Sequence, residues 1–267
     1  MPITTLDQVI SGSQQPRIFS KATSPTLVAG RPFTYWATPG NPGAGTWDAT
    51  LNGVAVYANN AGSLQFTNPT SGSTYLSRLQ ASATQAGTLM LVDRLWHNGG
   101  YTITATTPQN ITQPTLPARD WSGTTAGNGV FAAAMLSVAS GAGTPTITIN
   151  YTNSSGANGR TSTNVLATAA TSVAGSWYMM GLQAGDNGIR NVASLTLSAT
   201  WTSGTLNLGL FRLIAALEMP QAFVPNAIDA LTSGFPILYN DSALEFVFMP
   251  NTTTASTIQG QVAWTQG

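Results

Sequence analysis

Asp93 and His97 are the residues best placed for acid–base chemistry. His97 is the single histidine of the chain, and Asp93 precedes it by four positions. On a helix they would share a face, and the carboxylate could orient the imidazole as a general base. Residues 88–96, however, have the composition of a buried strand, where positions 93 and 97 share a face without close contact. No Gly-x-Ser-x-Gly motif supplies a serine nucleophile. We therefore interpret His97 as a surface or interface histidine.

The acidic residues offer a second kind of chemistry, since glycoside hydrolysis needs two carboxyl groups set across a cleft. Nine acids are scattered singly along the chain: Asp7, Asp48, Asp93, Asp120, Asp186, Glu218, Asp229, Asp241 and Glu245. Any two could meet in the folded chain, but turns and helix caps are the expected places for so few acids. Residues 186–188, Asp-Asn-Gly, match part of a calcium loop without its other oxygen ligands, which favours a turn. The sequence thus predicts no catalytic, cofactor-binding or metal-ligating residue, and we expect neither a cofactor nor an enzyme.

Tryptophans are the remaining candidates for a binding role. Trp36, Trp47 and Trp121 lie in stretches rich in glycine and proline, where an indole could contact a second subunit or stack on a sugar ring. We favour subunit contact for these three residues, because aromatic side chains are enriched at protein interfaces. Trp201 and Trp264 lie on the apolar faces of predicted strands and are expected in the core.

Charge is scarce in this chain of 267 residues. Charged residues make up 7% of the sequence, against roughly 25% in an ordinary soluble domain, and nine basic residues balance nine acidic ones. This balance argues against nucleic acid and anionic membranes as partners, because both are bound through clustered lysine and arginine. Threonine, serine, asparagine, glutamine and glycine supply the polarity instead. Neutral groups cost less to desolvate than charges, so such a surface suits a chain packed permanently against neighbours.

Cysteine is absent, which excludes disulfides and thiolate chemistry. The first residues show neither a basic start nor an apolar run of signal-peptide length, so we expect synthesis in a cytoplasm without export. No stretch is long and apolar enough to predict a membrane span.

Alternating apolar and polar residues indicate β-strands. The windows are 88–96, 101–105, 147–151, 195–201, 206–210, 244–248 and 258–264. Residues 202–205, Thr-Ser-Gly-Thr, are expected to close a hairpin between 195–201 and 206–210. Helix is predicted at two connectors. One is 75–86, with Leu76, Leu79 and Ala83 on one face, and the other is 226–231, with Asn226 as N-cap and Gly234 as terminator.

These patterns predict an all-β fold, an antiparallel β-sandwich of jelly-roll type with one or two short connector helices. Residues 1–45 contain six prolines among polar residues, so we expect an extended N-terminal arm that lies on a neighbouring subunit. Residues 46–267 would form the sandwich. The proline-rich stretch 107–117 is either a long crossing between two sheets or a division between two domains, and we favour the crossing.

Two segments of the C-terminal third resemble virion structural proteins of tailed bacteriophages. The first comprises residues 182–192 (LQAGDNGIRNV) and 195–200 (LTLSAT), and the second residues 226–236, 249–256 (MPNTTTAS) and 260–262. The resemblance implies a particle component on the virion surface, of the capsid decoration or cement type. It implies the major capsid protein and copies of the chain itself, arranged as a homo-oligomer such as a trimer, as partners. It carries no site residues.

Three functions follow from these observations. The favoured one is a non-enzymatic virion protein that bridges capsomers through neutral contacts. The alternative is a tail, fibre or host-attachment domain that binds surface glycans, which would use the three loop tryptophans. The third, a polysaccharide-degrading enzyme, would need a pair of the scattered acids to meet.

Overall fold

Antiparallel β-sheets dominate the computed structural model, which describes residues 3–234 and 236–267. Seventeen strands in this part of the chain form three sheets, and the two helices are short. The expected all-β, antiparallel, sandwich-like fold is therefore confirmed.

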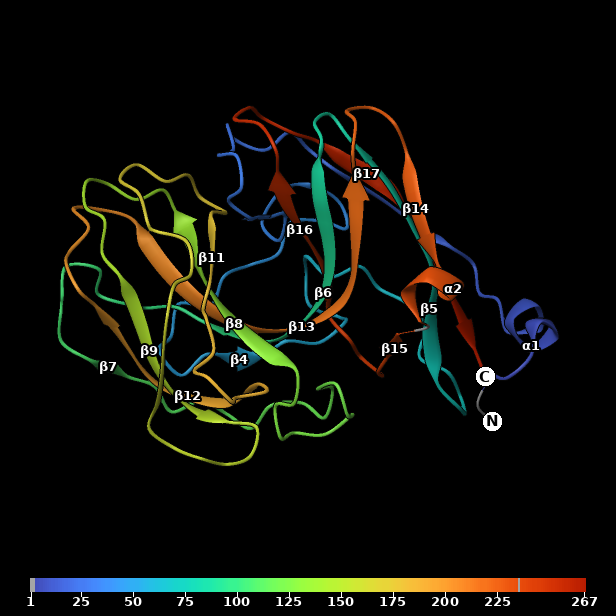
Figure 1. Cartoon of the computed structure of the whole chain (residues 1–267), viewed down its shortest axis with the longest axis horizontal. Coiled ribbons are helices and arrows are strands. Elements are labelled where there is room, and N and C mark those ends of the chain that lie inside the picture. The colour runs from blue at the N-terminus through green and yellow to red at the C-terminus, as the bar shows by residue number, and fades with distance from the viewer. Residues whose placement is uncertain (1–2, 235) are drawn as a thin grey trace.

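The central sheet runs in the order β11-β8-β13-β6-β16-β2, with β4 also paired to β6. Its strands are β2 (Phe33–Thr34), β4 (Val54–Ala55), β6 (Gly87–Asn98), β8 (Val130–Val138), β11 (Trp177–Met179), β13 (Thr205–Met219) and β16 (Leu244–Pro250). Because β6 and β13 are the longest strands, they extend beneath both of the other sheets (Figure 1).

The other two sheets lie at opposite ends of β6 and β13. We call them the terminal sheet, which contains the first and last strands, and the β9 sheet. The terminal sheet has the order β14-β5-β17-β1-β3, and β15 is also paired to β5. Its strands are β1 (Arg17–Lys21), β3 (Gly40–Asn41), β5 (Thr74–Ala83), β14 (Asn226–Asp229), β15 (Ile237–Leu238) and β17 (Ile258–Gln266). The β9 sheet has the order β10-β9-β12-β7, and its strands are β7 (Gln109–Asn110), β9 (Ile147–Asn153), β10 (Arg160–Thr163) and β12 (Ile189–Leu197). In Figure 1 the β9 sheet is at the left and the terminal sheet at the right.

The two largest hydrophobic cores lie beneath these two sheets, and β13 contributes to both. Leu206, Leu208 and Leu210 pack in the core beneath the β9 sheet, whereas Leu217 and Met219 pack in the core beneath the terminal sheet. Within the proline-rich stretch 107–117, Ile111 and Leu116 pack in the first of these cores. The two cores therefore share one central sheet.

Most of residues 1–45 are built into the fold instead of forming the expected arm. β1 pairs with β17, and Phe19 is buried with its ring stacked on Phe246 at a centroid distance of 4.0 Å. β2 pairs with β16. Pro25, Pro32, Pro39 and Pro42 lie in the loops between short strands, so the proline content of the sequence concealed the strand pairing. Only α1 (Leu6–Ser11) fits the expectation, since it has no buried residue and projects from the body (Figure 1).

The helix expected at 75–86 is wrong, because these residues form β5. A register shift in the β5–β17 pairing makes Ser77 an extra residue, so Leu76 and Leu79 both point inward. A β-bulge shifts the two-residue period of a strand by one position and here imitates the spacing of a helix.

The second expected helix is shorter and later than predicted. Asn226 begins strand β14, and α2 (Ala230–Ser233) follows with Asp229 as its N-cap. Gly234 ends the helix in the left-handed conformation (φ 71°), as glycine does most readily.

The hairpin expected at 195–210 is also wrong. β12 belongs to the β9 sheet and β13 to the central sheet, so the turn at 202–204 carries the chain from one sheet to the other. Residues 101–105 are a loop whose Tyr101 and Ile103 still reach the core. The strands expected near 88–96, 147–151, 244–248 and 258–264 are confirmed as β6, β9, β16 and β17. Trp201 and Trp264 are buried, as predicted.

Candidate docking surface

Asp93 and His97 do not form a pair, because β6 bulges between them. Trp96 pairs with Leu210 and Arg94 with Phe211, which leaves Leu95 as an extra residue. The bulge reverses the alternation of faces, so Asp93 and His97 lie on opposite faces of the central sheet. The carboxylate cannot orient the imidazole in this arrangement.

His97 is buried, which corrects the expectation of a surface or interface histidine. Its Nδ1 lies 3.1 Å from Nη1 of Arg94, so the neutral ring accepts a hydrogen bond from the guanidinium. Burial, reinforced by the charge of Arg94, lowers the pKa of His97 to about 3. Arg94 in turn forms a two-pronged ion pair with Glu245, at 2.7 Å for Nε and 3.0 Å for Nη2. Thr34 Oγ1 also donates to this carboxylate.

A second buried ion cluster lies on the opposite face, between the two cores. The carboxylate of Asp93 is 3.3 Å from Nε of Arg119 and 3.6 Å from Nη2 of Arg212. It also accepts hydrogen bonds from the Ser242 hydroxyl at 2.7 Å and the Ala243 amide at 2.8 Å. These contacts join strands of the central sheet to the loops on that face.

The single lysine of the chain is buried as well. Nζ of Lys21 donates to the carbonyl oxygens of Thr38, Pro42 and Gly43, at 3.1, 2.8 and 3.3 Å. Burial lowers the pKa of Lys21 to about 8, although the charge of Glu245 opposes this shift. The lysine therefore pins the 38–43 loop onto β1 instead of facing solvent.

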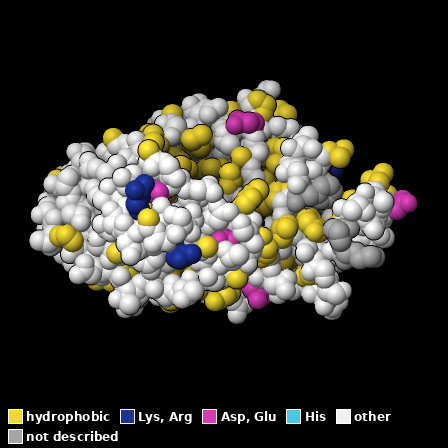
Figure 2. All heavy atoms as spheres, turned by 60° about the horizontal axis from the view of Figure 1, so that its bottom comes forward, with side chains coloured by type: hydrophobic (Ala, Val, Ile, Leu, Met, Phe, Trp, Pro, Cys, Tyr) yellow, Lys and Arg dark blue, Asp and Glu magenta, His cyan; other side chains and the backbone are white. Residues whose placement is uncertain are grey.

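The surface is consequently even less charged than the composition suggests. Of the nine basic and nine acidic residues, seven are buried: Lys21, Asp93, Arg94, Arg119, Asp120, Arg212 and Glu245. The other eleven are spread over an accessible surface of 10868 Å² that displays neither lysine nor histidine. Figure 2 shows one face on which neutral atoms predominate, with apolar side chains gathered between the two ends of the molecule. Ordinary protein surfaces rely on charge for solubility, and this one does not.

The carboxylate of Asp186 has a structural role. Asp186 accepts hydrogen bonds from the Tyr151 hydroxyl at 2.5 Å, from Asn153 Nδ2 at 2.7 Å and from Arg160 Nε at 2.9 Å. The bond from Arg160 is the main reason that the pKa of Asp186 falls to about 2. This carboxylate holds the predicted Asp-Asn-Gly segment against β9 and β10.

The three candidate tryptophans have different environments and do not form one site. Trp36 is 1% exposed, and its ring stacks on the guanidinium of Arg94 at 4.3 Å, so it is not available for a surface contact. Trp47 is half-buried beside the same guanidinium, at 5.4 Å. Trp121 is 63% exposed.

The loop that carries Trp121 is held by the carboxylate of Asp120. This carboxylate accepts hydrogen bonds from the amides of Ser122, Thr124 and Asn128 and from the Thr124 hydroxyl, at 2.7–3.0 Å. Burial alone would raise the pKa of Asp120, but these bonds bring it below its ordinary value. The indole of Trp121 is therefore presented on a braced loop.

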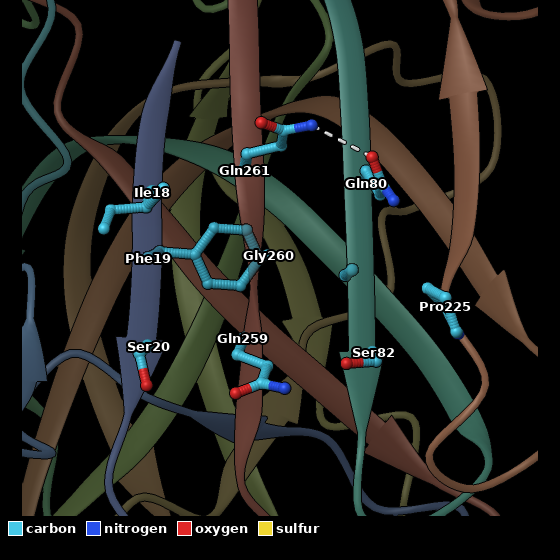
Figure 3. A pocket seen from close by; sticks show the side chains of 10 residues that line it. Ile18, Phe19, Ser20, Gln80, Ser82, Pro225, Gln259, Gly260 and Gln261 are labelled. Atoms are coloured by element: carbon cyan, nitrogen blue, oxygen red, sulfur yellow. Dashed lines mark hydrogen bonds between the residues drawn. The ribbon is translucent and has the colours of Figure 1, made fainter.

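The outer face of the terminal sheet was not found by sequence reasoning. Two rows of neutral side chains cross β1, β17 and β5. One row consists of Ile18, Gln261 and Gln80, and the other of Ser20, Gln259 and Ser82 (Figure 3). With Pro225 they line a shallow hollow of about 400 Å³. The signal was present in the alternation of Gln259 and Gln261 with apolar neighbours, but its meaning depended on which strands lay alongside.

Residues 3–234 and 236–267 contain no group of three or more histidine, aspartate or glutamate side chains that could hold a metal ion. No helix within these residues has the length and apolar character needed to span a membrane.

No protein-family model matches the chain, and no curated protein matches its sequence. Among solved structures, the VP2 subviral particle of infectious bursal disease virus has a TM-score of 0.20 and 10% identity, over 96% of this chain and 82% of the VP2 chain. T=1 particles of a mutant VP2 from the same virus give a TM-score of 0.16 and 10% identity, over 95% and 78%. Both matches are to viral particles formed by VP2, and TM-scores this low indicate no shared fold.

Proposed function

We propose that this chain is a non-enzymatic structural subunit of a virion, docked permanently through uncharged surfaces. The observation that carries the proposal is the burial of seven charged residues in a chain that has only eighteen. Apolar and amide contacts are not weakened by charge screening, whereas surface ion pairs weaken as salt is added. Such a surface suits a particle that must persist through changing media.

The sequence resemblance supplies the finer version of the proposal. In that version the chain is a decoration or cement protein on a phage capsid, with the major capsid protein and copies of itself as partners, for example in a trimer. Asp93 and His97 lie on opposite faces of the central sheet, and the ion clusters of Asp93 and Glu245 are buried, so none of these residues offers an accessible acid–base site.

The test is to add the purified protein to undecorated capsid shells and to measure bound protein per shell and the temperature at which the shells open. We expect saturable, stoichiometric binding that raises this temperature and that changes little between low and high salt. Absence of binding, or binding abolished by moderate salt, would contradict the proposal.

A glycan-binding attachment domain is the second candidate, and Trp121 is the observation that favours it. An exposed indole on a braced loop is a suitable platform for a sugar ring, because an aromatic face can cover the C–H groups of the ring. Binding of the isolated protein to a glycan array or to host cells, lost in Trp121→Ala and retained in Trp36→Phe, would support this candidate over the first.

A further inference from the structure

The outer face of the terminal sheet has unused hydrogen-bonding capacity. Nε2 of Gln261 donates to Oε1 of Gln80 at 3.0 Å, and within the described residues the side chains of Gln259, Ser20 and Ser82 have no hydrogen-bond partner. Amides and hydroxyls both donate and accept, so two copies of such a face can bond to one another. None of the side chains in the two rows is charged, and two copies would not repel.

An exposed apolar loop stands at one end of the same face. Phe223 is 74% exposed, and its amide donates to the Ala83 carbonyl at 2.8 Å, next to Ser82 of the hollow. Val224 is also exposed, and Pro225 lines the hollow directly. The loop and the hollow are therefore neighbours on one surface.

The backbone of Phe223 adds an independent observation. Its φ of 64° lies in the left-handed region, which a bulky side chain rarely adopts. Residues held in such conformations gather at binding and functional sites, where another contact offsets the strain. A ring that is mostly in solvent gains little from its own chain, so the compensating contact is expected outside it.

We propose that a second copy of this chain docks on the outer face of the terminal sheet about a two-fold axis, with the Phe223–Val224 loop of each copy entering the hollow of the other. A two-fold contact uses the same patch on both copies, so the patch must be complementary to itself. This face carries an exposed apolar loop beside a hollow, and its amides and hydroxyls both donate and accept hydrogen bonds. This inference rests on the proposed function, because both assume that the chain is docked permanently through uncharged surfaces.

The first experiment compares Phe223→Asn with Leu231→Asn by sedimentation velocity over a wide range of protein concentration. Asparagine adopts the left-handed conformation readily, so Phe223→Asn should fold at least as stably as the parent protein. We expect self-association of this variant to weaken by roughly 30-fold or more, as for the loss of an aromatic anchor. Leu231 is 90% exposed on α2 and does not line the hollow, so its variant should associate like the parent. A parent protein that stays monomeric, or equal effects of the two substitutions, would overturn the proposal.

The second experiment identifies the occupant. Gln259 lies on β17, in the middle of the face, so Gln259→Glu and Gln259→Lys should each weaken self-association through like-charge repulsion. An equimolar mixture of the two variants should associate again, because the glutamate of one copy then attracts the lysine of the other. Failure of the mixture to associate would show that this face does not meet its own copy.

Shell binding separates this inference from the proposed function. A parent protein that pairs through this face and ignores capsid shells would contradict only the proposed function. A parent protein that binds shells and stays monomeric in solution, with Phe223→Asn binding shells equally well, would contradict only the two-fold docking.

Discussion

Asp93 and Arg94 are consecutive in β6, and their side chains enter opposite faces of the central sheet to join separate buried ion clusters. Asp93 meets Arg119 and Arg212 on the face that carries the two cores. Arg94 meets Glu245 on the other face. These two adjacent residues thus form ion pairs on both sides of the sheet, and both pairs remove charge from the surface. Burying charge is compatible with folding only when each ion finds a partner, and both do.

Breaking the Arg94–Glu245 pair on one side should be strongly destabilising. Arg94→Met would leave the carboxylate of Glu245 buried without its ion partner, and we expect a loss of about 3–5 kcal/mol in the free energy of unfolding. Arg94→Met combined with Glu245→Met should recover much of that loss, because no uncompensated charge remains. Urea denaturation measures both, with the exposed Arg190→Met as control. Equal losses for the single and double variants would contradict the account.

Asp186 should make stability depend on pH in the acid range. Its pKa is about 2 in the folded protein against an ordinary 3.8, so the unfolded chain binds more protons between these values. The contribution of Asp186 to stability is therefore complete above about pH 4 and is lost as the pH falls towards 2. Asp186→Asn should flatten the fall in melting temperature over this range, whereas the exposed Glu218→Gln should leave it in place. A slope unchanged in Asp186→Asn would refute the assignment.

Lys21 should resist amine-reactive reagents while the protein is folded. Its Nζ is buried against three backbone carbonyls, so an acylating reagent at pH 8 should leave it unmodified. In denaturant the same reagent should modify it, which mass spectrometry of a digest can show. An engineered surface lysine, Gln259→Lys, provides the reactive control in the same chain. Acylation of Lys21 as fast as of the engineered lysine would show that the 38–43 loop opens freely.

Asp120 should determine the order of the loop that presents Trp121. Asp120→Ala removes the acceptor of four hydrogen bonds, and we expect a loss of about 1–3 kcal/mol in stability. We also expect faster proteolytic cleavage within residues 120–129, because local opening becomes easier. Asp48→Ala, which removes contacts to Thr50 in an exposed loop, is the matched control. Cleavage at the same rate in both variants would contradict a special role for Asp120.

Local patterns predicted several strands correctly and failed where a bulge intervened. Residues 147–151 alternate strictly and form β9 as expected. In β5 the extra Ser77 gave Leu76 and Leu79 a helical spacing, and in β6 the extra Leu95 separated His97 from Asp93. A bulge is fixed by the pairing with a partner strand that is distant in sequence, so a local window does not reveal it.

The candidate contact residues show the same limit. Trp36, Trp47 and Trp121 share a glycine- and proline-rich setting in the sequence, yet Trp36 is buried against Arg94 and Trp121 faces solvent. The neutral face around Gln259 was not predicted, because it exists only once β1, β17 and β5 lie side by side.

The all-β class, the buried positions of Trp201 and Trp264, and the scarcity of charge were determined by the sequence alone, since composition and two-residue alternation are properties of neighbouring residues. The tertiary structure decided which sheet each strand joins, which charges are turned inward, and which neutral side chains gather beside Phe223. These outcomes depend on long-range strand pairing, whose register sets the facing of every side chain.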